Sequence, residues 1–249
     1  MNRGPSGRAP LRRILAQAKV ELLLTLRRGE SLLVTIGIPV GILAFFSVVD
    51  VLPHGSGKAV DFLVPGVLAL SVISSAMTSL GIATGFERHA GVLRRLGTTP
   101  LRRSGLLAAK SLALLATVVV QVAAVAGVGL LLGWNPSGGL AIAAGLIVLG
   151  VVVFAGLGFL LAGRLRAETN LAAANGLFLV FLLLGGIVVS LSRLPKGVAA
   201  FSRALPAEPL ATSLRIALQN GSVPVRALLT LAAWAVGSCV LAVATFRWD

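Results

Sequence analysis

Side chains able to carry out catalysis or to bind metals are scarce in this sequence. The 249 residues include one cysteine, Cys239, together with 2 histidines and no tyrosine, and Asp and Glu number only 8. A single cysteine forms no intrachain disulfide, and so few His and Cys residues argue against a His/Cys metal site. The chain has no HExxH motif, no GxSxG motif and no paired acids. We therefore predict no catalytic residue and no metal site.

A nucleotide-binding P-loop is also missing from the sequence. The nearest match is Gly57-Lys58, which lacks the upstream glycine at the required spacing and has no Ser or Thr after it. We therefore expect that this chain does not hydrolyse ATP and binds no cofactor of its own.

The composition is that of a membrane protein. Apolar residues make up 57% of the chain and charged residues 12%, about half the share in soluble domains. One soluble fold could not bury so much apolar surface, and a disordered chain has the opposite composition. The net charge of +14 would suggest nucleic-acid binding in a soluble protein. Short cytoplasmic loops of membrane proteins also collect Lys and Arg, so we expect no nucleic-acid partner.

Long apolar runs predict an all-α polytopic protein with six transmembrane helices, because about 20 apolar residues cross a bilayer. The runs cover 31–50, 63–86, 105–133, 139–163, 171–191 and 225–246. No loop between them could hold a soluble domain, so residues 31–249 are expected to form one transmembrane domain after a terminal segment at 1–30. Residues 1–9 read as a disordered tail.

The distribution of Lys and Arg predicts the orientation. Sixteen of the 22 cations lie on the side that holds both termini, and six lie on the other. Lys and Arg concentrate in cytoplasmic loops, so both termini are predicted to be cytoplasmic. The high content of Ala, Gly, Arg and Leu suggests a GC-rich bacterial genome, and hence the bacterial cytoplasmic membrane.

Residues 11–28 are predicted to form an amphipathic helix. Its apolar face contains Leu11, Ile14, Leu15, Ala18, Leu22 and Leu26. Such a helix suits the inner membrane surface, with its cations near anionic headgroups. The alternative is a cytosolic extension of the first span.

Few polar residues fall inside the predicted spans. Lys110 lies about one turn into the third span, where it can extend to the cytoplasmic surface, and Gln121 and Asn175 are uncharged. Each amide could form a hydrogen bond between helices or contact a substrate. No Asp or Glu lies near a bilayer midplane, which argues against an ion-coupled transporter.

The loop at 87–104, between the second and third spans, is basic and has its own apolar pattern. Glu87 is expected near the start of a helical stretch, where the helix dipole favours a negative charge. Val92, Leu93 and Leu96 form an apolar strip, and Thr99-Pro100 can end this helix and start the next. The loop could present a rigid knob to a cytoplasmic partner, or it could only fix the orientation of the chain.

This loop resembles the cytoplasmic loop of type 2 ABC exporter permeases, in particular those of the daunorubicin-resistance type. The pattern is Glu87-Arg88-x-x-Gly91-x-Leu93-x-x-Leu96-x-x-Thr99-Pro100-Leu101, followed by Lys110 in the next span. One departure is His89, where a charged residue is more usual.

The segment at 192–224 gives a second match to the same family. It contains Leu205-Pro206-Ala207-Glu208-Pro209-Leu210-Ala211-Thr212, then Arg215 and Gly221. The family carries short re-entrant or extracellular helices here, before the last span. The pattern alone predicts a helix with Pro209 at its first position, Leu210, Leu214, Ala217 and Leu218 on one face and a cap at Asn220-Gly221. Its alternative is an amphipathic surface helix.

The resemblance implies a transport subunit rather than an enzyme. Two such subunits, identical or paralogous, would pair in the membrane above two copies of a separate ABC ATPase that bind ATP and Mg. Coupling to the ATPase would use Glu87, Arg88, Gly91, Leu93, Arg94, Arg95, Leu96 and Pro100, with Leu93 and Leu96 entering the ATPase and Arg94 and Arg95 pairing with its acids.

The expected cargo is lipophilic or amphipathic, such as a drug, antibiotic, lipid or lipid-linked glycan. This follows from the apolar candidate path, in which Gln121 and Asn175 are the notable polar residues. The alternatives are a membrane subunit of a non-ABC transport assembly and a nucleotide-independent channel or scaffold.

Overall fold

The computed structural model describes residues 8–27, 29–48, 59–97, 103–187 and 195–245. All the regular structure in these residues is helical, which confirms the all-α class. In chain order the helices are α1 (Arg8–Arg27), α2 (Gly29–Val48), α3 (Ala59–Ile73), the π-helix η1 (Ser74–Ser79), α4 (Leu80–His89), α5 (Val92–Gly97), α6 (Arg103–Leu131), α7 (Leu140–Arg164), α8 (Ala167–Leu184), α9 (Lys196–Ala204), α10 (Ala207–Asn220) and α11 (Val225–Thr245).

Within the described residues, 5 helices are long and apolar enough to cross a membrane. The first joins α3, η1 and α4 into Ala59–His89, and the others are Ser104–Leu131, Leu140–Arg164, Ala167–Leu184 and Val225–Thr245. The first predicted span corresponds to α2, whose apolar stretch Thr35–Ser47 is shorter. The multi-pass membrane architecture is therefore confirmed, whereas the count of six spans stays a prediction.

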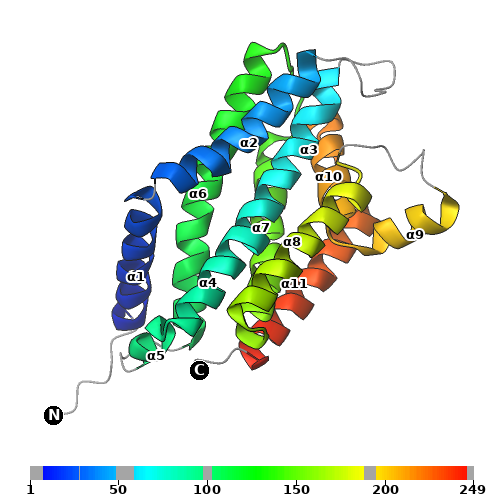
Figure 1. The fold of residues 1–249 in the computed structure, drawn as a ribbon. Helices are drawn as coiled ribbons and strands as arrows, with labels where there is room; N and C mark the ends of the chain where they lie inside the picture. The colour runs from blue at the N-terminus through cyan, green and yellow to red at the C-terminus, as the bar shows by residue number, and fades with distance from the viewer. Residues whose placement is uncertain (1–7, 28, 49–58, 98–102, 188–194, 246–249) are drawn as a thin grey trace.

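The helix α7 lies at the centre of the bundle and packs against α3, α4, α10 and α11 (Figure 1). Glycines allow the closest of these contacts. A Cβ atom on Gly81 of α4 would lie 3.0 Å from the Cα atom of Gly158 on α7, which is tighter than most real Cβ contacts. Small residues that let backbones approach are a general device for packing helices in membranes.

Both α1 and α5 lie at the end of the bundle where α11 finishes (Figure 1). From this end α1 runs alongside α6 rather than across the bundle, and α2 continues toward the other end. Ile14, Ala18 and Leu22 on the predicted apolar face are partly buried, whereas Leu11 and Leu15 are exposed. A helix forms here as predicted, but it begins at Arg8, inside the segment predicted to be a disordered tail. Its position relative to the membrane surface stays a prediction.

The helix α10 is buried, so it is not the amphipathic surface helix considered above. Its predicted apolar face is confirmed, because Leu210, Leu214, Ala217 and Leu218 are all buried. Gly221 ends the helix with φ +64°, as expected for a glycine cap. The predicted start was wrong, because the helix begins at Ala207 and Pro209 is its third residue.

The helix α8 also differs from the predicted span at 171–191. It covers Ala167–Leu184 and is followed by Gly185 and then Gly186, which has φ +63°. A left-handed glycine ends a helix readily even inside an apolar run. The apolar run continues beyond Leu184, so the sequence predicted an end for this span that lies too far along the chain.

Candidate functional site: the α4–α5 turn and the charged cluster behind it

The turn between α4 and α5 depends on Gly91. This residue has φ +71°, a conformation that costs other residues energy because their Cβ atom meets the backbone. The turn is closed by hydrogen bonds from the Ala90 amide to the Phe86 carbonyl at 2.9 Å and from the Gly91 amide to the Arg88 carbonyl at 3.0 Å. A Cβ atom on Gly91 would meet open space, so the glycine is needed for its backbone angle and not for lack of room.

The helix α5 presents cations outward and leucines inward. Leu93 is 0% exposed and belongs to the hydrophobic core, and Leu96 packs against that core. Val92, Arg94 and Arg95 are exposed. This corrects the expectation that Leu93 would enter a partner protein, because its side chain fixes α5 to its own subunit.

Arg88 ties α4 to the end of α7. Its guanidinium donates two hydrogen bonds at 2.6 Å, from Nη1 to the Gly163 carbonyl and from Nη2 to the Leu165 carbonyl. These carbonyls lie at the C-terminal end of α7, where a cation also interacts favourably with the helix dipole. A movement of α4 is therefore passed directly to the central helix.

Glu87 lies in the last turn of α4, not near the start of a helix as predicted. A carboxylate is unfavourable at a helix C-terminus, and a cation compensates for it. The Lys110 ammonium on α6 lies 2.6 Å from Glu87 Oε2. The expected stabilisation by the helix dipole is thus replaced by an ion pair between two helices.

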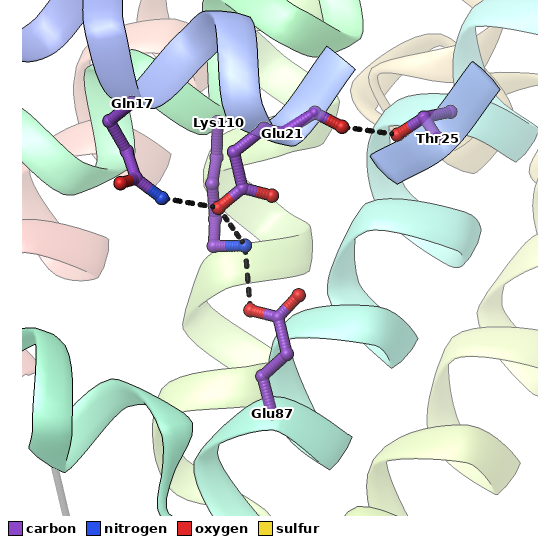
Figure 2. Close-up of polar contacts among 5 residues, drawn as sticks. All are labelled: Gln17, Glu21, Thr25, Glu87 and Lys110. Atoms are coloured by element: carbon purple, nitrogen blue, oxygen red, sulfur yellow. Dashed lines mark hydrogen bonds and ion pairs between the residues drawn. The ribbon is translucent and has the colours of Figure 1, made fainter. Parts of the chain in front are cut away.

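Lys110 also binds α1. Its ammonium lies 2.9 Å from Glu21 Oε1, which accepts a hydrogen bond of 3.0 Å from Gln17 Nε2 (Figure 2). Only 2% of the Lys110 side chain is exposed, so it does not extend to the surface as expected. Glu21, Glu87 and Lys110, which we call the charged cluster, join α1, α4 and α6.

The charged cluster borders a cavity of about 140 Å³ between α1, η1, α4 and α6. Hydroxyl groups of Thr25, Ser75, Ser79 and Thr117 line the same space. Glu21 was not singled out in the sequence. The signal for it was a lone acid among cations in 11–28, four residues after Gln17, on the same side of the helix.

Gln121 links three helices and does not face an open path. Its Oε1 accepts a hydrogen bond of 2.8 Å from Ser75 of η1, and its Nε2 donates one of 2.8 Å to the Thr35 carbonyl of α2. Pro39 explains the second bond, because a proline has no N–H to donate to the carbonyl four residues earlier. The side chain of Gln121 replaces this missing donor.

The second predicted pathway residue, Asn175, is exposed and donates to the Leu171 carbonyl of its own helix at 2.9 Å. A different amide, which sequence reasoning missed, joins two helices. Asn170 is 0% exposed and donates a hydrogen bond of 2.8 Å to the Gly81 carbonyl of α4. It lies between two predicted spans, where polarity suggested a loop, and no sequence signal distinguished it.

Of the predicted outer residues, Arg215 makes the contacts that the structure shows between helices. Its guanidinium lies 3.9 Å from the centre of the Phe62 ring and donates to the Gly186 carbonyl at 3.2 Å. Burial lowers the pKa of Arg215 to about 10, and the Glu208 carboxylate opposes the shift. The group remains a cation at neutral pH. Pro206 directly precedes α10 and Pro209 lies in its first turn.

The predicted coupling residue Pro100 lies outside the described residues. Among the residues that are described, no group of three or more His, Cys, Asp or Glu side chains could hold a metal ion.

Comparisons with known proteins match this chain to a transporter family. The family model described as "ABC-2 type transporter" matches residues 12–218. The chain is also similar to the "Probable multidrug ABC transporter permease YbhS" of Escherichia coli strains K12 and O157:H7, with 28% identity over 173 residues in each case. These matches cover 66% of the chain and 44% of the relatives, so the chain spans less than half the length of the proteins it matches.

Proposed function

Because the chain belongs to the ABC-2 type transporter family, we propose that it is the permease subunit of an ATP-driven exporter in the bacterial cytoplasmic membrane. In this proposal an ABC ATPase on a separate subunit binds ATP and Mg, and the chain itself catalyses no reaction. Both termini lie on the cytoplasmic side, together with α5.

The main support for the proposal is the way in which α5 is held against its own subunit. A glycine turn, a buried Leu93 and the core contact of Leu96 fix this short helix to the subunit. The fixed helix presents Arg94 and Arg95 on its exposed side. A rigid, basic projection at one end of a membrane bundle suits an acidic surface on a soluble partner.

Two connections carry a displacement of α5 into the membrane bundle. Arg88 connects α4 to α7, and the charged cluster connects α4 to α1 and α6. Since α7 packs against most of the other helices, a shift of the α4–α5 turn reaches the whole bundle. ATP-driven closure of the ATPase would thus change access between the two sides by rigid-body movement of helices.

The proposed cargo is lipophilic or amphipathic. The amides Gln121 and Asn170 are buried and bond to neighbouring helices, so neither side chain is exposed to a hydrophilic cargo. The name of the similar E. coli permease includes the word multidrug, which agrees with this class of cargo. Two permease subunits would pair to enclose the path, and two ATPase subunits would bind below them.

The test is co-purification of the chain from its native membranes in mild detergent, with mass spectrometry of the bound proteins. The informative variant is Arg94→Glu, which reverses an exposed charge on α5. The matched control is Lys196→Glu, which reverses an exposed charge at the start of α9. We expect a P-loop ATPase with wild-type protein and with Lys196→Glu, and at least tenfold less of it with Arg94→Glu.

The alternatives make different predictions in the same experiment. A membrane subunit of a non-ABC assembly would bring down a partner without a P-loop, and a channel or scaffold would bring down none. Either result with the wild-type chain would overturn the exporter proposal. Equal recovery of an ATPase with both variants would keep the exporter and reject α5 as its contact.

A further inference from the structure

Two arginines line a hollow on the side of the bundle formed by α9 and α11. The hollow has a volume of about 440 Å³, and its walls include Arg203 of α9 and Arg226 of α11. Both side chains are exposed. Among the described residues, no ion pair involves either arginine, so the hollow carries positive charge that its own subunit does not neutralise.

A second, smaller hollow of about 160 Å³ shares Arg203, Arg226 and Thr230 with the first. Glu208 lines it too, but this carboxylate accepts a hydrogen bond from Thr212 and lies near Arg215. This hollow therefore sets one carboxylate against two arginines. The two arginines keep a local excess of positive charge.

An apolar hollow lies next to the first one along α11. Ala233 and Trp234 border both the arginine-lined hollow and a third hollow of about 260 Å³ between α7 and α11. The rest of the third hollow is lined by Leu157, Leu160, Gly237, Ser238 and Leu241. A Cβ atom on Gly237 would meet nothing within 4 Å, so this glycine opens the floor of the hollow.

The hollows follow one face of α11. Arg226, Thr230, Ala233, Gly237 and Leu241 recur at the spacing of three or four residues that places side chains on one side of a helix. We call this surface, with Arg203 and Trp234, the α11 groove. Trp234 is fixed in it, because its indole N–H donates a hydrogen bond of 2.9 Å to the Ala204 carbonyl.

The length of the groove suits one leaflet of a membrane. From Thr230 to Leu241 the helix rises about 16 Å at 1.5 Å per residue. Half of the hydrocarbon core of a bilayer measures about 15 Å. A tryptophan beside the charged end is also typical of the level where headgroups meet acyl chains.

We propose that the α11 groove binds an anionic phospholipid. The phosphate lies between Arg203 and Arg226, with the Thr230 hydroxyl as a further donor. One acyl chain passes Trp234 and lies over Gly237 toward Leu241. Guanidinium groups suit this role because their planar N–H donors match phosphate oxygens. The site does not depend on the ATPase contact proposed for α5, and either could fail without the other.

The test measures lipid retention by native mass spectrometry on the full-length chain, purified with delipidating detergent. The probes are dioleoyl-phosphatidylglycerol, which is anionic, and dioleoyl-phosphatidylcholine, which has no net charge. We expect several-fold tighter binding of phosphatidylglycerol. The double variant Arg203→Gln/Arg226→Gln should weaken that binding about tenfold or more, because each cation near a lipid surface contributes measurably.

A second variant tests the acyl-chain part without changing charge. Gly237→Leu fills the floor of the groove and should weaken phosphatidylglycerol binding about fivefold, as expected for loss of several buried methylene contacts. The matched control Gly127→Leu introduces the same side chain at an exposed, open position on α6 and should bind as wild type. The charge control is Arg164→Gln/Arg166→Gln, at the end of α7 and the start of α8. This variant should still bind phosphatidylglycerol several-fold more tightly than phosphatidylcholine.

Three results would overturn the proposal. Equal binding of the two lipids would remove the role of the charge, and wild-type binding by Gly237→Leu would remove the role of the groove. Competition by inorganic phosphate at the same concentration as the lipid would show a simple anion site. A folded Gly237→Leu variant with weaker lipid binding supports the proposal even where the double arginine variant fails to fold.

Discussion

The charged cluster and the α11 groove hold their cations in different ways. Lys110 is buried between two carboxylates that come from two other helices. Arg203 and Arg226 are exposed and line hollows, and among the described residues neither forms an ion pair. A buried cation with its own counter-ions connects helices of one subunit, whereas an exposed cation without them is available to a ligand from outside.

The charged cluster and the α11 groove therefore have different roles in the bundle. Around the charged cluster, three helices move together because one ammonium is shared among them. In the α11 groove, the helices leave a gap that the surrounding membrane fills.

Lys110→Met should have the largest effect. It leaves Glu21 and Glu87 facing each other in a mostly buried site, and removal of one partner from a buried ion pair is strongly destabilising. We expect a loss of about 2–4 kcal/mol in unfolding free energy, less than for a fully buried pair because Glu87 is 29% exposed. Unfolding in mixed micelles titrated with dodecyl sulfate measures it.

The control for Lys110→Met is the triple variant Glu21→Gln/Glu87→Gln/Lys110→Met. It removes all three charges, so it should recover more than half of the lost stability. An unfolding midpoint for Lys110→Met equal to that of the wild type would contradict a shared ammonium between α1, α4 and α6.

Gln121→Ala tests whether a side chain has replaced the backbone donor that Pro39 lacks. Alone it leaves Ser75 and the Thr35 carbonyl without Gln121, at an expected cost of about 1–3 kcal/mol for two interhelical bonds. Adding Pro39→Ala supplies an N–H for that carbonyl, so the double variant should lose less than the sum of the singles. Additive losses in the same unfolding assay would exclude this role of Gln121.

Gly91→Ala changes only a backbone preference at the α4–α5 turn. Alanine at φ +71° should cost about 1 kcal/mol, although its Cβ atom meets no neighbour. Gly176→Ala is the matched control, because Gly176 lies in α8 with open space around it and helical angles. The control should be neutral or slightly stabilising. Equal effects on unfolding free energy from the two changes would rule out strain at Gly91.

Arg215→Lys should have the smallest effect. It keeps the positive charge near Glu208 and weakens the stacking over Phe62 and the bond to Gly186. The expected cost is about 0.5–1 kcal/mol. The same unfolding titration measures this loss. A loss above 3 kcal/mol would show that Arg215 contributes as much to stability as Lys110 does.

Local patterns in the sequence were sufficient to predict the helices. The apolar runs gave the membrane class, the leucine spacing gave the buried face of α10, and Asn220-Gly221 gave its end. These features depend on residues within a few positions of one another. The end of α8 was missed because two glycines interrupt an apolar run whose hydropathy continues past them.

Contacts between distant residues could not be predicted from the sequence. The direction of Leu93 depends on how the Gly91 turn orients α5 against the core. The cluster joins Glu21 to residues 66 and 89 positions later in the chain. Each partner alone has an ordinary explanation, such as a surface acid or a lysine near the membrane boundary. Only the packing of α1 against α6 brings them within bonding distance.

Photo-crosslinking from α5 in intact cells can identify the protein that contacts this helix. A photoreactive amino acid replaces Arg94 in one variant and Val198, an exposed residue of α9, in the control. We predict a crosslink from position 94 to a protein that carries a P-loop, and none from position 198. No crosslink to such a protein from position 94, or equal crosslinks from both positions, would contradict the role of α5 as the contact with the ATPase.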